Sequence, residues 1–280
     1  MNNTETRVCR KCQQPYEAQY WDIGGMLKTK ILRGDGYCVT CAKQVYDEEV
    51  AKEEAARLAE IAGIRRKRRE SSRIPPKFKD SDFSTFEKGW QDNAYQRCWD
   101  YAAGFPIDKR PIGYRSLYLW STESWGTGKT HLASAICHRI YDRWDGKGNK
   151  ACPRIIFLSE PELFRRIQAT YSFTREESQL RESEDDIIKS IVYADLVVLD
   201  DVGKEPRKDM QFVRKTLFAI INGRYDQKLP MIITANLKPE QLNKHLDGTG
   251  EASFGRFYDE MCGGKSTRMD GKSYRRKDGH

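Results

Sequence analysis

The chain has 280 residues, of which 38% are hydrophobic and 32% charged, and its formal net charge is +8 at pH 7. This length can bury the core of one large domain and leave a smaller module beside it. No apolar run is long enough to cross a membrane and no apolar segment near Met1 suits a secretory signal, so we expect a cytoplasmic protein without a membrane partner, in which the eight cysteines are metal ligands or core residues rather than disulfides.

Four cysteines near the start of the chain form two pairs, Cys9-x-x-Cys12 and Cys38-x-x-Cys41, with 25 residues between them. Each pair can place two sulfurs on one metal ion, and four thiolates complete a tetrahedral zinc site with no open position. This pattern indicates a structural zinc, with four buried free cysteines as the alternative. We therefore predict a zinc-ribbon-like module over residues 1–46, stabilised by its metal because it is too short to build its own core.

Residues 47–73 are predicted to form an exposed, basic helical linker. They contain few helix breakers and much Ala, Glu, Lys and Arg, with only a thin apolar stripe. The segment is acidic at its start and basic at its end, as a helix dipole favours. Pro75 and Pro76 then end any helix. A larger domain is expected over residues 74–280.

Positive charge is concentrated in two parts of the chain. Residues 65–79 contain eight Lys or Arg and one acid, and residues 265–280 contain six Lys or Arg and two acids. The rest of the chain is slightly acidic. A run of like charge is either a solvated helix face or tail, or a surface that contacts nucleic-acid phosphates, and charge alone does not decide between these.

From residue 117 onward, short apolar runs alternate with helical patterns. Such alternation implies a parallel sheet with helices on its faces, and hence an α/β fold. The predicted strands are residues 117–120, 155–158, 196–199 and 231–234.

Residues 123–130 follow the first of these strands and are typical of a phosphate-binding loop. The glycines allow backbone N–H groups to turn toward phosphate oxygens, Lys129 would supply a charge to the outer phosphates of ATP, and the Thr130 hydroxyl would ligate Mg²⁺. Glu123 stands where the strict pattern has glycine, and an ordinary Gly-rich turn is the alternative. The residues predicted to bind the nucleotide here are Ser124, Trp125, Gly126, Thr127, Gly128, Lys129, Thr130 and His131.

Polar side chains also follow two later strands. Asp200 would hold the same Mg²⁺, directly or through water, and Asp201 could orient or deprotonate the attacking water. Asn236 could hold that water or the γ-phosphate. The plainer alternatives are a solvated loop acid for Asp201 and a turn residue for Asn236.

The order of these motifs resembles the AAA+ ATPases. In particular, the chain is similar to the replicative helicase loaders of the DnaC and DnaI type, in the IstB-like ATP-binding family, over about residues 72–276. The four-cysteine segment also resembles the DnaI-type branch. The segments that carry the likeness are residues 74–78, 83–86, 125–133, 195–205, 230–237 and 271–275.

This resemblance implies further roles. Asn236 would be the first sensor residue, Arg256 the arginine finger that reaches the ATP of a neighbouring subunit, and Arg275 a second sensor. Only 24 residues follow Arg256, so the helical lid of most AAA+ proteins is not expected. Glu123 departs from the family's glycine, which affects the expectation for nucleotide affinity or turnover but not for the fold.

The function implied is ATP-dependent loading of a hexameric replicative DNA helicase onto single-stranded DNA during replication initiation. The zinc module and linker would bind the helicase, and the ATPase domains would associate side by side and hold the DNA on a basic surface. Two alternatives remain open. One is a transposase-helper ATPase of the IstB type, against which the zinc module weighs, and the other is a nucleotide-binding adaptor without turnover.

Overall fold

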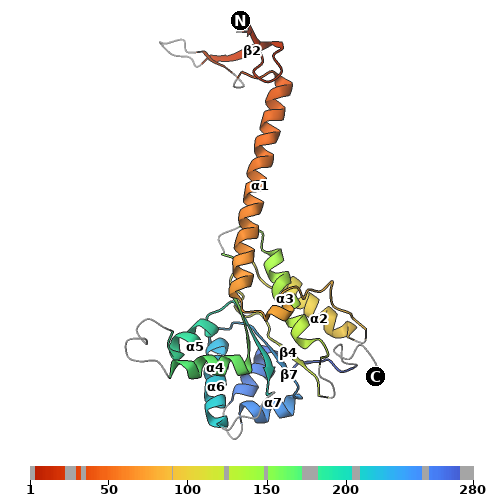
Figure 1. The fold of residues 1–280 in the computed structure, drawn as a ribbon, viewed down its shortest axis with the longest axis vertical. Helices are drawn as coiled ribbons and strands as arrows, with labels where there is room; N and C mark the ends of the chain where they lie inside the picture. The colour runs from red at the N-terminus through yellow and green to blue at the C-terminus, as the bar shows by residue number, and fades with distance from the viewer. Residues whose placement is uncertain are drawn as a thin grey trace. The chain divides into compact units, whose positions relative to one another are not determined.

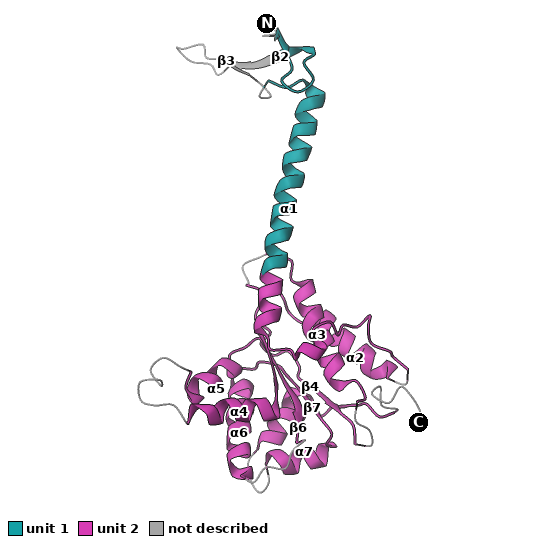
Figure 2. Cartoon of the chain, in the orientation of Figure 1, with its two compact units in different colours: residues 1–63 teal, residues 64–280 magenta. Residues whose placement is uncertain are grey.

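The computed structural model describes residues 4–22, 30–32, 36–89, 91–122, 126–147, 151–171, 182–203, 209–247 and 252–271. The chain divides into two compact units, Met1–Gly63 and Ile64–His280 (Figure 2). Within the described ranges, no helix combines the length and the apolar composition that crossing a bilayer requires.

The first unit contains a small antiparallel sheet and most of a long helix. Strand β1 (Thr4–Val8) pairs with β2 (Pro15–Asp22), which pairs with β3 (Lys30–Leu32). Helix α1 (Val39–Ser71) begins directly after Cys38. It therefore starts inside the range predicted for the zinc module and covers nearly all of the range predicted for the linker.

The second unit is built on a five-stranded sheet in the order β5-β6-β7-β4-β8, in which every neighbouring pair is parallel. Strands covered on both faces need apolar side chains in both directions, which explains their continuous apolar runs. The strands are β4 (Leu117–Trp120), β5 (Ile155–Ser159), β6 (Leu196–Val202), β7 (Met231–Ala235) and β8 (Thr267–Arg268).

Helices cover both faces of this sheet (Figure 1), which confirms the predicted α/β architecture. Helices α2 and α3 pack against each other on one side, and α4, α5 and α6 lie on the other. The helical segments of this unit are η1 (Pro76–Phe78), α2 (Asp92–Gly104), α3 (Lys129–Arg143), α4 (Glu160–Thr170), α5 (Glu184–Val192), α6 (Met210–Asp226), α7 (Pro239–Leu246) and the π-helical η3 (Gly255–Met261).

A buried arginine connects α6 to the amino edge of the sheet. Arg224 is fully buried, and its guanidinium donates to the backbone carbonyls of Ile191, Val192, Ala194 and Pro230. Burial lowers the pKa of Arg224 to about 9, which leaves the group protonated at pH 7. This side chain therefore donates to four carbonyls in a dry region, of which that of Ile191 also accepts from the N–H of Ala194 at 3.4 Å.

Replacing Arg224 with Met is expected to lower the free energy of unfolding by at least about 3 kcal/mol, because each buried carbonyl left without a donor costs about 1–3 kcal/mol. Urea denaturation of the full chain measures this change. The matched control is Arg110→Met, since the exposed Arg110 makes one 3.3 Å hydrogen bond, to the carbonyl of Tyr193. Equal losses in both variants would contradict the role given to Arg224.

Candidate nucleotide-binding site

The loop that enters α3 depends on two glycines with left-handed backbone angles. Gly126 has a φ of 80°, and Gly128, which caps the helix, has a φ of 92°. Residues other than glycine rarely adopt such backbone angles. The first N–H groups of α3 have no partners within the helix, and a helix N-terminus favours negative charge. The segment is thus suited to bind phosphate.

Lys129, the first residue of α3, is 6% exposed and lies against the ends of two neighbouring strands. Its Nζ donates to Ser121 Oγ at 2.6 Å, to Asn236 Oδ1 at 2.8 Å and to Thr127 Oγ1 at 3.3 Å. Ser121 follows β4 and Asn236 follows β7. The ammonium group is therefore held at the carboxyl edge of the sheet, where side chains from parallel strands converge.

Asp200 lies beside this cluster, near the end of β6, and is 4% exposed. Thr130 Oγ1 is 3.1 Å from both carboxylate oxygens, and Thr234 Oγ1 donates to Oδ1 at 2.5 Å. Burial, together with the nearby charge of Asp201, raises the pKa of Asp200 to about 6, so the group is mostly ionised at pH 7. The hydroxyl of Thr130 and the buried carboxylate of Asp200 are oxygen ligands of the kind that Mg²⁺ prefers, and they lie in contact.

Asp201 has an unusual backbone conformation. Its φ is 56°, and the pairing of β6 with β7 shifts register between Leu199 and Val202, around this residue. Its N–H donates to Thr234 Oγ1 at 3.0 Å. A left-handed non-glycine residue at a bulge costs energy and commonly marks a functional position.

Two members of this cluster, Ser121 and Thr234, were missed by the sequence reasoning. Thr234 is fully buried within the apolar strand β7, and its hydroxyl links Asp200 to the backbone of Asp201. A polar residue inside an otherwise apolar strand was the available signal. Ser121 gave only a weak signal, its position one residue after β4.

A family model described as IstB-like ATP binding protein matches residues 119–279. The chain belongs to this family. The match spans the phosphate-binding loop, Asp200 and Asn236, and it supports ATP binding by this IstB-like protein.

The IstB-like chain also resembles solved structures and curated relatives. A crystal structure of the DnaC helicase loader matches with a TM-score of 0.52 and 22% identity, over 70% of this chain and 100% of that one. A crystal structure of DnaI matches with a TM-score of 0.49 and 20% identity, over 74% and 98%. The likeness to the DnaC structure shows that the second unit shares that fold, which confirms the predicted fold class.

Among curated proteins, the chromosomal replication initiator protein DnaA of Streptococcus thermophilus is 22% identical over 202 residues, which is 71% of this chain. The IstB-like chain spans 40% of the length of that relative.

Other residues predicted for the site lie apart from the cluster or outside the described residues. His131 Nε2 is 2.9 Å from the carbonyl of Asp82, and the histidine ring meets that of Phe86 edge-on, so His131 contacts the segment before α2. Arg256, on η3, lies over the rings of Phe218 and Tyr225 of α6. The residues outside the described ranges are Glu123, Ser124, Trp125 and Arg275.

The four cysteines of the first unit lie together, with all Sγ atoms within 4.8 Å of one another. Cys12 Sγ and Cys38 Sγ are 3.8 Å apart, and the N–H of Cys38 donates to Cys9 Sγ at 3.3 Å. Zn–S bonds of about 2.3 Å in a tetrahedron place sulfurs about 3.8 Å apart. The cluster in this IstB-like protein therefore fits a metal that takes four thiolates.

The basic run at the end of α1 is partly used inside the second unit. Arg65 donates to the carbonyl of Trp144 from both Nε, at 2.8 Å, and Nη2, at 2.5 Å, and Arg69 pairs with Asp142. Arg66 and Lys67 are exposed and, within the described residues, have no hydrogen bond or ion pair. Arg65 and Arg69 therefore have structural partners, which neither the solvated face nor the nucleic-acid contact predicted, and a nucleic-acid contact would use Arg66 and Lys67.

Proposed function

We propose that this chain is an ATP-dependent loader that places a hexameric replicative DNA helicase on single-stranded DNA. The observation that carries the proposal is the convergence of Lys129, Thr130, Asp200 and Asn236 at one edge of an AAA+ sheet. Family membership supports ATP binding, and the fold shared with the DnaC helicase loader supports the loading role. The cysteine cluster distinguishes the chain from a bare ATPase domain.

In this proposal each residue of the cluster has a distinct task. Lys129 binds the outer phosphates, while Thr130 and Asp200 hold Mg²⁺. Asp201 orients the attacking water as a general base, and Asn236 positions that water or the γ-phosphate. When ATP is bound there, it would supply a γ-phosphoryl group for transfer to this water, with ADP as the leaving group. The loop residues 124–131 surround the nucleotide, with Arg275 as a second sensor.

Arg256 is proposed to act on the ATP of a neighbouring subunit. Its guanidinium is half-buried over Phe218 and Tyr225, and its buried Nη1 has no hydrogen-bond partner among the described residues. An unsatisfied buried donor is costly, and an anionic acceptor would satisfy it. Side-by-side association of ATPase domains would bring such an acceptor.

Three successive segments of the chain are proposed to have different functions. Residues 1–46 bind zinc through Cys9, Cys12, Cys38 and Cys41 and bind the helicase. Residues 47–73 connect this module to the ATPase domain over residues 74–280. Exposed cations such as Arg66 and Lys67 contact the phosphates of single-stranded DNA, which would make that affinity fall steeply with salt.

Co-purification with a helicase tests the loading function. The full chain, with ATP, is expected to retain a hexameric replicative helicase and to transfer it to a single-stranded DNA circle. Retention of a transposase instead would favour the helper function that the family name suggests. Stable helicase binding with no ATP hydrolysis, even with DNA present, would favour an adaptor without turnover.

The metal gives a separate prediction. Purified protein is expected to contain one zinc per chain, and Cys38→Ser should abolish helicase binding while ATP binding persists, because the second unit has its own apolar core. Elemental analysis and a nucleotide-binding assay check both parts. Cys98→Ser, which alters a buried cysteine outside the cluster, is the control for zinc content. Less than about half an equivalent of zinc, without exposure to chelators, would contradict a closed four-thiolate site.

A further inference from the structure

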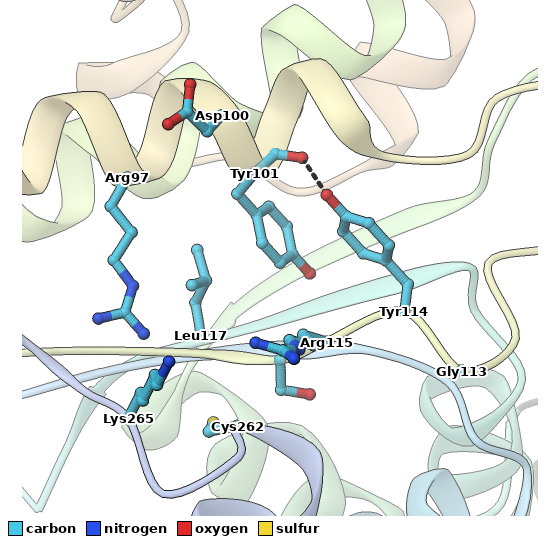
Figure 3. A pocket seen from close by; sticks show the side chains of 10 residues that line it. Arg97, Asp100, Tyr101, Gly113, Tyr114, Arg115, Leu117, Cys262 and Lys265 are labelled. Carbon is cyan, nitrogen blue, oxygen red and sulfur yellow. Dashed lines mark hydrogen bonds between the residues drawn. The ribbon is translucent and has the colours of Figure 1, made fainter.

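A cavity of about 650 Å³ opens at the amino edge of the parallel sheet, between α2 and the segments that enter β4 and β8 (Figure 3). The candidate nucleotide site lies at the opposite edge. Arg115 lines the cavity before β4, and Ser121 contacts Lys129 after β4. Six residues of extended chain at about 3.3 Å each separate the two sites by roughly 20 Å. The cavity is therefore distinct from the phosphate-binding loop.

Three cations from separate segments line this cavity: Arg97 of α2, Arg115 before β4 and Lys265 before β8. Arg97 donates to the carbonyl of Ser266 at 2.9 Å. Arg115 and Lys265 are exposed, and neither has a hydrogen bond or ion pair within the described part of the chain. Asp100 is the one acid among the described lining residues, and it accepts from Gln96 Nε2 at 2.8 Å. The lining carries a net positive charge.

A buried hydroxyl also faces this cavity without a partner. Tyr101 is 7% exposed, and its hydroxyl has no hydrogen bond among the described residues. Figure 3 shows this oxygen directed away from α2 toward Arg115, while the hydroxyl of Tyr114 donates to the carbonyl of Tyr101 at 2.7 Å. Burial raises the pKa of Tyr101 well above its ordinary value, so the group keeps its proton and can donate. A buried donor without an acceptor is costly, so an acceptor that enters the cavity, whether a ligand oxygen or an ordered water, would stabilise this hydroxyl.

We propose that this cavity binds a phosphoryl group, either a backbone phosphate of single-stranded DNA or a free phosphate compound. Arginine and lysine offer charge-assisted hydrogen bonds to phosphate oxygens, and the Tyr101 hydroxyl supplies a neutral donor from the cavity wall. The net positive lining would repel a cationic ligand, and a neutral ligand would leave the cations without a counter-charge. For DNA, the inference rests on the proposed function, whereas binding of free phosphate does not depend on it.

The test uses the full chain with Arg115→Gln and Lys265→Gln together. Fluorescence anisotropy measures affinity for a labelled oligo-dT as salt is varied, and ³¹P NMR measures inorganic phosphate binding in a Lys129→Ala background. Losing two phosphate contacts is expected to flatten the slope of log affinity against log salt by about 1.4. Tyr101→Phe, which removes one hydroxyl, should weaken binding roughly tenfold, as expected for one hydrogen bond to a charged acceptor.

The matched control is Lys215→Gln with Lys244→Gln, which removes the same charge from exposed positions on α6 and α7. A loss confined to the DNA measurement identifies a backbone phosphate, and a loss confined to the NMR measurement identifies a free phosphate compound. Unchanged binding in both measurements, an equal loss in the control pair, or no effect of Tyr101→Phe would overturn the proposal. Helicase co-purification on the unmodified chain separates a failure of this site from a failure of the loading function.

Discussion

Lys129→Ala is expected to lower ATP affinity by at least about 100-fold. Two hydrogen bonds from an ammonium group to phosphate oxygens contribute about 1.5–3 kcal/mol each, and each 1.4 kcal/mol is a factor of ten. The effect should be this large because Lys129 is 6% exposed and is held by Ser121 and Asn236, so its charge is in place before the nucleotide arrives. Calorimetric titration with a nonhydrolysable ATP analogue measures it.

Lys215→Ala is the matched control for this prediction, because Lys215 is an exposed lysine on α6 outside the cluster. Thermal unfolding of both variants checks that lost affinity does not reflect lost folding. Unchanged ATP affinity in folded Lys129→Ala protein would show that residues 126–130 are not the nucleotide site, despite the geometry of Gly126 and Gly128.

Arg256→Ala is expected to keep ATP binding and to lose turnover. Removing an arginine finger costs roughly 10³–10⁵ in rate in GTPases, and AAA+ sites can depend on it less. If Arg256 serves a neighbouring subunit, mixing Arg256→Ala with Asp201→Asn should restore part of the activity. The first variant then contributes an intact Asp201, and the second contributes an intact Arg256. Steady-state ATPase rates over a range of mixing ratios measure the recovery.

Lys129→Ala mixed with Asp201→Asn is the control for this experiment, because each of these variants damages its own nucleotide site and neither can repair the other. Recovery in this control mixture would show that the ATPase activity comes from a contaminant and not from shared nucleotide sites. Absence of recovery for Arg256→Ala at every ratio would show that Arg256 does not act between subunits, and side-by-side association would lose its main support.

The two largest effects thus test different levels of the same proposal. Lys129 tests a site built within one chain, where the contacts with Ser121, Thr127 and Asn236 can be measured directly. Arg256 tests an assembly, since its guanidinium lies over the rings of Phe218 and Tyr225 and its buried Nη1 has no hydrogen-bond partner among the described residues. If ATP affinity depends on Lys129 but mixing with Arg256→Ala restores no activity, the protein binds ATP at a site that is not shared between subunits.

The features that could be predicted from the sequence alone are those that depend on short spacing. The apolar runs ending at Trp120 and Leu199 predicted buried parallel strands, and the polar residues after them had to meet because the carboxyl ends of parallel strands share one edge. The cysteine pairs likewise predicted a four-sulfur cluster, because two residues between cysteines suffice to place both sulfurs on one ion.

Which distant residues meet could be seen only in the folded chain. Chain order does not reveal that β7 lies between β6 and β4, and that position is what brings Thr234 to Asp200 and Asn236 to Lys129. The basic run of α1 looked uniform until Arg65 was found to be bonded to Trp144. The cavity beside α2 likewise joins that helix to Cys262 and Lys265, which lie more than 150 positions later in the chain. These contacts depend on strand order and helix packing, which are set by the burial of the whole apolar core and leave no local pattern in the sequence.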